Sequence, residues 1–195
     1  MTFKFTPADI LPLDVYEGKR PQKRLELLTI KENRRVNVGP YGVFLFENAD
    51  TIWWQIHEML RIEKGGQEQI EDELQAYNPM LPQGNDLVAT VMIEIPDADE
   101  RRKVLAQLGH LEDTLFMEIA EKRIPGVQVN PEERTDETGK TSSVHFIRFT
   151  FDEETKGLFL EKTHPVTLGF AHPNYAYSTI LTPQVHQALC EDFNV

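Results

Sequence analysis

Three glutamates and a glutamine on two neighbouring predicted helices are the residues best placed for acid–base or metal chemistry. Residues 52–63 are predicted to form a helix, and one face of it carries Ile52, Ile56, Met59, Leu60 and Glu63. Glu63 ends this apolar stripe, where a carboxylate needs a partner, a metal or a proton because an isolated buried charge is costly. One interpretation is a base or metal ligand, Glu63 with Gln55 or Glu58 nearby. The alternative, which we favour, is a last-turn glutamate that reaches solvent or an arginine.

The same chemistry could also draw on residues outside this helix. Glu73 lies at the edge of the apolar stripe of a second predicted helix, over 67–77, and would face the first helix across a hairpin. His172 opens a turn that ends at Tyr175, and such a histidine serves recognition or bonds local backbone; we weight the two roles equally. The candidate pocket is therefore Gln55, Glu58, Glu63, Glu73, His172 and Tyr175. No cofactor is predicted, but oxygen and imidazole groups without thiolates suit iron, manganese or zinc.

Common catalytic signatures are missing from the chain. The triplet at 139–141, Gly-Lys-Thr, lacks the P-loop glycine, because Arg134 occupies that position and a strand is expected to follow. His57-Glu58 opens a zincin-like helix, yet Arg61 stands where the second histidine is needed. The Glu-x-x-His pairs of di-iron bundles are also absent. The motifs therefore leave open whether the protein is an enzyme.

Charge is distributed unevenly along the chain. Residues 19–35 hold seven basic and two acidic side chains, a net charge of +5, which leaves −17 on the other residues of a chain whose total is −12. A basic segment of this kind can dock an acidic partner, and the candidate docking residues are Arg24, Lys31, Arg34 and Arg35. The alternative is a solvated helix face. The overall acidity argues against nucleic-acid binding.

The positioning elements fall into two halves of one predicted domain, residues 1–195. The first half, residues 1–80, is helix-rich, with helices at 6–11, 21–34, 52–63 and 67–77 and a short hairpin at 36–46. The second half, residues 81–195, is sheet-rich, with strands at 87–95, 115–119, 143–151 and 166–170, helices after 96, 152 and 182, and a long loop or β-excursion over 125–141. The predicted fold class is α+β, a helical N-terminal layer packed on a mainly antiparallel sheet.

Composition restricts the location and the assembly of the protein. A single cysteine, Cys190, excludes an intrachain disulfide, and no apolar run approaches the ~20 residues of a membrane span. We therefore expect a cytoplasmic protein with no membrane partner. Trp53, Trp54 and the Phe-rich strands could form a homo-oligomer interface, although core packing explains them better.

Four strings resemble a bacterial family of unknown function. They are EMLRIE at 58–63, ELQAYNP at 73–79 (ELxAYNP in the family), ATVMIE at 89–94 and HPNYAYST at 172–179, in this order over most of the chain. Members are often encoded near rubrerythrin-like proteins and an iron–sulfur oxidoreductase. The resemblance implies a bacterial protein linked to peroxide or iron-redox handling, and it supplies no catalytic residue. We therefore expect an accessory or binding protein with a redox partner; the alternative is a small metal-binding protein or enzyme using the Glu/His pocket.

Overall fold

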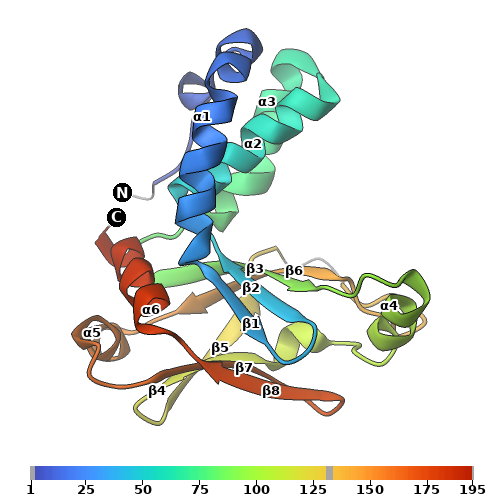
Figure 1. Cartoon of the computed structure of the whole chain (residues 1–195), viewed down its shortest axis with the longest axis vertical. Coiled ribbons are helices and arrows are strands. Elements are labelled where there is room, and N and C mark those ends of the chain that lie inside the picture. The colour runs from blue at the N-terminus through green and yellow to red at the C-terminus, as the bar shows by residue number, and fades with distance from the viewer. Residues whose placement is uncertain (1–2, 131–133, 195) are drawn as a thin grey trace.

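A single antiparallel sheet forms the lower part of the molecule (Figure 1). The computed structural model describes residues 3–130 and 134–194, and the strand order is β1-β2-β3-β6-β5-β4-β7-β8. The strands are β1 (Arg35–Val38), β2 (Gly42–Phe46), β3 (Asp86–Ile93), β4 (Leu115–Ile119), β5 (Lys122–Gln128), β6 (Val144–Thr150), β7 (Val166–His172) and β8 (Tyr175–Ile180). The predicted α+β class and antiparallel pairing are therefore confirmed.

The sheet curls into a near-closed barrel, so that β1 and β8, at the two ends of the strand order, lie side by side. Tyr175 bridges this seam. Its hydroxyl donates to the carbonyl of Val38 at 2.8 Å and accepts from the backbone N–H groups of Tyr41 and Gly42 at 2.9 and 2.7 Å. Gly39 makes the approach possible, because a Cβ on its φ +68° backbone would lie 2.6 Å from the Tyr177 ring.

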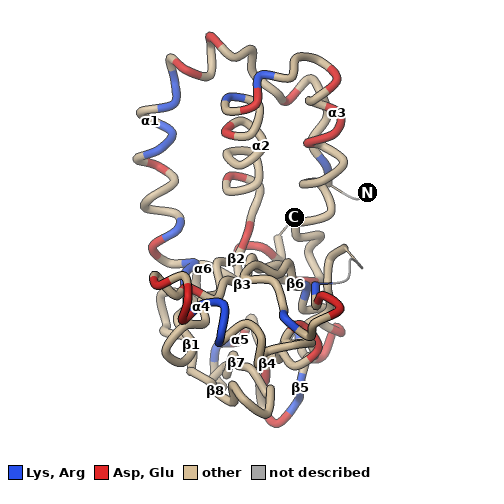
Figure 2. The backbone as a smooth tube through the Cα atoms, turned by 90° about the vertical axis from the view of Figure 1, so that its right-hand side faces the viewer, with Lys and Arg blue, Asp and Glu red and all other residues tan. Residues whose placement is uncertain are grey.

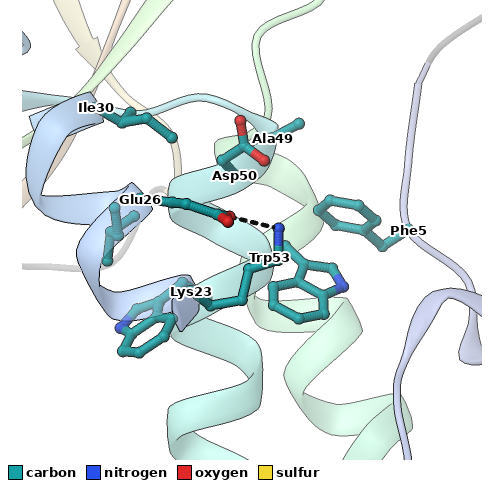
Figure 3. A pocket seen from close by; sticks show the side chains of 9 residues that line it. Phe5, Lys23, Glu26, Ile30, Ala49, Asp50 and Trp53 are labelled. Carbon is teal, nitrogen blue, oxygen red and sulfur yellow. Dashed lines mark hydrogen bonds and ion pairs between the residues drawn. The ribbon is translucent and has the colours of Figure 1, made fainter. Parts of the chain in front are cut away.

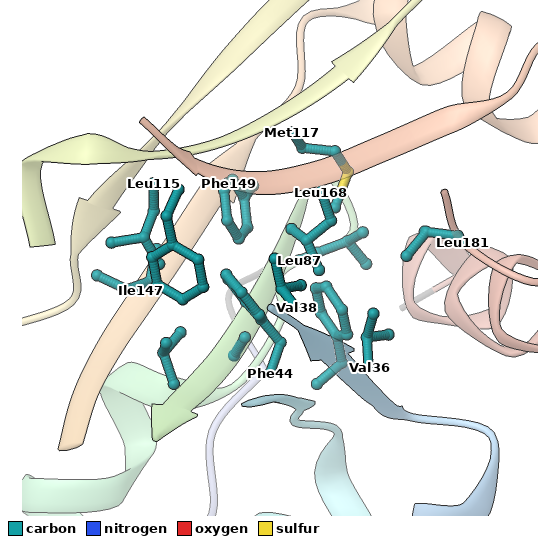
Figure 4. Packing of buried hydrophobic residues seen from close by; sticks show 14 of the residues in the cluster. Val36, Val38, Phe44, Leu87, Leu115, Met117, Ile147, Phe149, Leu168 and Leu181 are labelled. Atoms are coloured by element: carbon teal, nitrogen blue, oxygen red, sulfur yellow. The ribbon is translucent and has the colours of Figure 1, made fainter. Parts of the chain in front are cut away.

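Apolar side chains fill the barrel interior (Figure 4). The register sets Leu87 opposite Phe149 and Ala89 opposite Ile147, and all four side chains are fully buried. Because side chains alternate across a strand, this pairing turns one face of β3 and β6 inward together. The interior is therefore a packed core.

Three helices, α1 (Leu13–Glu32), α2 (Ala49–Glu63) and α3 (Gly66–Tyr77), rise from one end of the barrel and form what we call the helical arm (Figure 1). A view turned by 90° shows α2 between α1 and α3 (Figure 2). The predicted helical layer on the sheet is not confirmed, since the helices stand along the long axis of the molecule. A second core joins arm and barrel; it comprises Ile10, Ile52, Ile56, Leu74, Met80, Leu81 and Val88.

Helix boundaries differ from the prediction at Pro21. The helical spacing of Leu25, Leu28 and Thr29 predicts a helix that begins there. The structure places Pro21 inside α1, on the exposed side of the helix. Water can satisfy the carbonyl that a proline leaves without its helical N–H partner, so an exposed face tolerates it better than a buried one.

The remaining helices, α4 (Ala98–Leu105), α5 (Glu153–Glu161) and α6 (Pro183–Cys190), lie beside the barrel. The 3-10 turns are η1 (Pro7–Asp9), η2 (Asn78–Met80), η3 (Leu111–Thr114) and η4 (Glu191–Asn194). In the described parts of the chain, no helix has the length and apolarity needed to cross a membrane.

The sequence did not predict strands β5 and β8. Residues 125–141 were expected to be a loop or a β-excursion, and their first part is the end of β5, followed after the undescribed 131–133 by a bridge between Thr135 and Thr141. Pro125 and Gly126 suggested a loop, yet Gly126 suits this strand because a Cβ there would lie 2.6 Å from Ile147.

Candidate functional site

The Glu58 side chain on α2 links this helix to α1 through an ion pair and hydrogen bonds. Arg20 holds both carboxylate oxygens, with Nε 2.7 Å from Oε1 and Nη2 2.8 Å from Oε2, and the Tyr16 hydroxyl donates to Oε1 at 2.7 Å. The Arg20 hydrogen bonds lower the pKa of the Glu58 carboxyl; burial opposes this shift, and the Tyr16 bond adds to it. Glu58 is therefore an ionised structural group.

Gln55 contacts Glu47, a buried carboxylate that the sequence analysis missed. Glu47 is 0% exposed, directly after β2, and it accepts from Thr51 Oγ1 and Thr90 Oγ1 at 2.5 Å each and from Gln55 Nε2 at 3.1 Å. These bonds connect α2 to β3. The available signal was a charged residue at the end of the buried run 43–46, immediately before the helix cap Asn48.

Glu63 and Glu73 meet at the turn between α2 and α3. The side-chain amide of Gln69 donates to Glu63 Oε2 and to Glu73 Oε1, each at 3.0 Å, while Gln69 Oε1 accepts from the N–H of Gly65 at 2.6 Å. Glu63 is exposed, as in the alternative that we favoured, although its hydrogen-bonding partner is a glutamine and no arginine. Glu73 is buried. These hydrogen bonds hold α2 and α3 together beside the turn that connects them.

His172 and Tyr175 lie in the barrel, away from the arm. His172 Nε2 is 3.1 Å from the carbonyl of Gly109, and the N–H of Asn174 donates to Nδ1 at 3.1 Å. In this pattern Nδ1 is the acceptor and Nε2 faces a carbonyl acceptor. One nitrogen bonds the local backbone of the turn and the other a carbonyl 63 residues earlier in the chain, so both are used structurally. Tyr175 closes the barrel seam, and burial raises the pKa of its phenol.

The predicted pocket is therefore divided: Gln55, Glu58, Glu63 and Glu73 belong to the arm, whereas His172 and Tyr175 are cross-strand neighbours in the barrel, and of the six Glu63 and Glu73 share a hydrogen-bond partner among the described residues. Among the residues that the structure describes, no three His, Cys, Asp or Glu side chains are grouped so as to hold a metal ion. Binding of iron, manganese or zinc by this set stays a prediction that elemental analysis of the purified protein can test.

The predicted docking residues divide into two pairs. Arg34 is 3% exposed and holds both oxygens of Asp192, at 2.7 and 2.9 Å, so its place on a docking surface was wrong. The chain turns inward there because the backbone of Arg34 joins the barrel, where its carbonyl accepts from the N–H of Phe46 at 2.9 Å. Arg35 is exposed but paired with Glu94 at 2.6 Å.

Arg24 and Lys31 remain on the outside of α1. With Leu25 and Leu28 between them in sequence they form the outer α1 face, on which the two leucines are 62% and 57% exposed. The four residues lie on one side of α1, where Arg24, Leu25 and Leu28 are exposed and Lys31 is half-buried. The outer α1 face therefore combines two exposed apolar side chains with two cations.

A pocket of about 230 Å³ lies between α1 and α2 (Figure 3). We call it the α1–α2 pocket; its lining is Phe5, Lys23, Glu26, Leu27, Ile30, Ala49, Asp50, Trp53 and Trp54. The sequence analysis assigned both tryptophans to a core or an interface, yet both indoles are only half-buried. Their adjacency gave no signal of a pocket, because α1 supplies the opposite wall.

A buried imidazole in the barrel has an unsatisfied nitrogen. His145 is fully buried on β6; its Nε2 bonds the carbonyl of Ser142 at 2.9 Å, and Nδ1 lacks a hydrogen-bond partner among the described residues, 3.6 Å from Glu112 Oε2. Burial lowers the pKa of this histidine, and the charge of Glu112 opposes the shift. Among the described residues, only one of the two ring nitrogens of His145 is therefore satisfied.

Comparison with known proteins supports the family resemblance and supplies no activity. A solved structure from Burkholderia pseudomallei K96243, described as a novel protein of unknown function, is 35% identical, covers 97% of this chain and 99% of its own, and superposes with a TM-score of 0.89. No curated protein matches the chain. The model of a protein family of unknown function, DUF3501, matches residues 4–193, and the chain therefore belongs to the DUF3501 family.

Proposed function

We propose that this protein is an accessory protein that docks an acidic partner through the outer α1 face. The observation that carries the proposal is the exposure of Leu25 and Leu28 beside Arg24 and Lys31 on a helix that projects from the barrel. Apolar side chains at the centre of an interface exclude water, while flanking cations select an oppositely charged surface and speed the encounter.

The charges that remain available support this choice of partner. Arg20 and Arg34 belong to the same basic segment, but both are neutralised by internal carboxylates, Glu58 and Asp192. Arg24 is exposed and Lys31 is half-buried, and neither makes an ion pair with any described residue. A partner that buries this face therefore has to bring negative charge of its own.

The resemblance adds a class of partner to examine first. Rubrerythrin-like proteins and iron–sulfur oxidoreductases are the neighbours that it implies, and a redox protein with an acidic patch would satisfy the charge argument. The link to peroxide or iron-redox handling belongs to the proposal, as does a bacterial cytoplasmic location.

The test is affinity capture from cells that encode the protein, repeated with purified candidates. We expect the double reversal Arg24→Glu with Lys31→Glu to weaken the complex at least ten-fold and to reverse its salt dependence, because two attractive charges become repulsive and salt then screens the repulsion. The matched control is Arg102→Glu with Lys103→Glu on α4, two exposed cations outside the arm.

Two outcomes would contradict the proposal. One is a partner that binds the double-reversal variant as tightly as the wild type. The other is sedimentation showing that the wild type is a dimer which the same reversal dissociates, since the outer α1 face would then join two copies of this chain.

A further inference from the structure

The α1–α2 pocket has aromatic walls that are held rigidly in place. The indole N–H of Trp53 donates to the carbonyl of Asp9 at 3.0 Å, and its ring lies 3.8 Å from the His57 ring, centroid to centroid. His57 is itself fixed, because Nδ1 bonds the carbonyl of Trp53 at 2.8 Å and Nε2 accepts from the N–H of Leu11 at 3.0 Å. A wall anchored in this way loses little freedom when a ligand binds.

The polar part of the lining has a net negative charge. Lys23 and Glu26 pair with each other at 2.8 Å and cancel, as the dashed contact in Figure 3 shows. Asp50 is exposed, and its carboxylate makes no hydrogen bond or ion pair with any residue that the structure describes. The bond to Glu26 raises the pKa of Lys23, and the charge of Asp50 adds to the shift. One carboxylate is therefore left for a ligand.

An aromatic face beside a carboxylate is the combination that recognises organic cations. The arm already contains an example of this chemistry, since the guanidinium carbon of Arg20 lies 5.7 Å from the centre of the Trp54 ring. We propose that the α1–α2 pocket binds a small organic cation, an ammonium group on an apolar body, with Trp53, Trp54 and Phe5 around the body and Asp50 at the charge.

The size of the pocket sets the size of the ligand. A volume of about 230 Å³ lies below the range of drug-sized sites and suits a small molecule of about ten non-hydrogen atoms. Leu27 and Ile30 add an apolar wall from α1. This site is separate from the outer α1 face, so the proposal holds or fails independently of the docking function.

The chain offers a direct readout, because Trp53 and Trp54 are its only tryptophans and both line the pocket. We would titrate the full chain with phenethylammonium and follow tryptophan fluorescence. The probes for comparison are 2-phenylethanol, the neutral isostere, and phenylacetate, the anion. We expect saturable binding in the order cation, alcohol, anion, with the cation favoured over the alcohol by about three- to ten-fold.

Substitution then tests the charge. Asp50→Asn should weaken phenethylammonium about three-fold and leave 2-phenylethanol unchanged, whereas Asp50→Glu should keep the cation preference. The matched control is Asp72→Asn, an exposed aspartate on α3 that does not line the pocket. Equal affinity for the three probes, the absence of saturation, or an unchanged cation preference in a folded Asp50→Asn variant would each overturn the proposal.

Discussion

The barrel and the helical arm differ in how completely they cover their apolar side chains. Inside the barrel the apolar residues are almost fully buried, as Phe149 and Leu168 illustrate. The arm is a row of three helices with α2 between α1 and α3 (Figure 2), and it leaves leucines exposed and indoles half-buried. The barrel thus provides a stable base, while the arm provides the surfaces on which binding can act.

The largest predicted loss of stability follows from removing one core side chain of the barrel. Phe149→Ala is expected to lower the free energy of unfolding by about 3–5 kcal/mol, because it deletes a fully buried ring in a closed core. The control is Leu25→Ala on the outer α1 face, where we expect a change within about 0.5 kcal/mol. Urea unfolding followed by circular dichroism measures both, and similar losses in the two variants would contradict the contrast.

A smaller effect is expected at the barrel seam. Tyr175→Phe removes the hydroxyl that serves two backbone N–H groups and one carbonyl, so we expect a loss of about 2 kcal/mol. Tyr177→Phe is the matched control, because that ring is 45% exposed and its hydroxyl bonds no described residue. If thermal denaturation shows equal changes for the two variants, the Tyr175 hydroxyl does not hold the seam.

The smallest effect concerns the anchor of Trp53 in the arm. Burial lowers the pKa of His57 from its ordinary 6.5, and its neutral form accepts from Leu11. As the pH falls below 6.5, His57 becomes protonated in the unfolded chain while it stays neutral in the folded chain. Its contribution to the free energy of unfolding is therefore complete above pH 6.5 and is lost as the pH falls toward the lowered pKa. We expect His57 to contribute at most about 1.4 kcal/mol per pH unit in that window.

Urea unfolding at a series of pH values tests this titration. His57→Gln should flatten the dependence of stability on pH below 6.5, although buried His145 and His186, whose pKa values burial also lowers, will keep part of it. A His57→Gln slope identical to that of the wild type would show that His57 does not titrate in this window.

Much of the candidate site was beyond sequence reasoning for a definite physical reason. The stripe that ends at Glu63 lies on one helix, as predicted. Whether the Glu63 carboxylate is buried depends on how α3 packs against the end of α2, and it is exposed. Glu58 drew attention as a candidate base, and its arginine lies 38 residues earlier on another helix. Asp50, Trp53 and Trp54 are close in sequence, and only α1 and Phe5 turn them into a pocket.

The sequence by itself determined the helix and strand types of most segments, the antiparallel character of the sheet and the separation of basic and acidic regions. These features follow from periodicity, caps and composition, which act over a few neighbouring residues. Only the tertiary structure decided that the sheet closes into a barrel, that the helices form an arm, and that Arg34 is buried against Asp192, 158 residues away. Contacts of that range depend on the packing of the whole chain, because local patterns are compatible with several ways of bringing distant segments together.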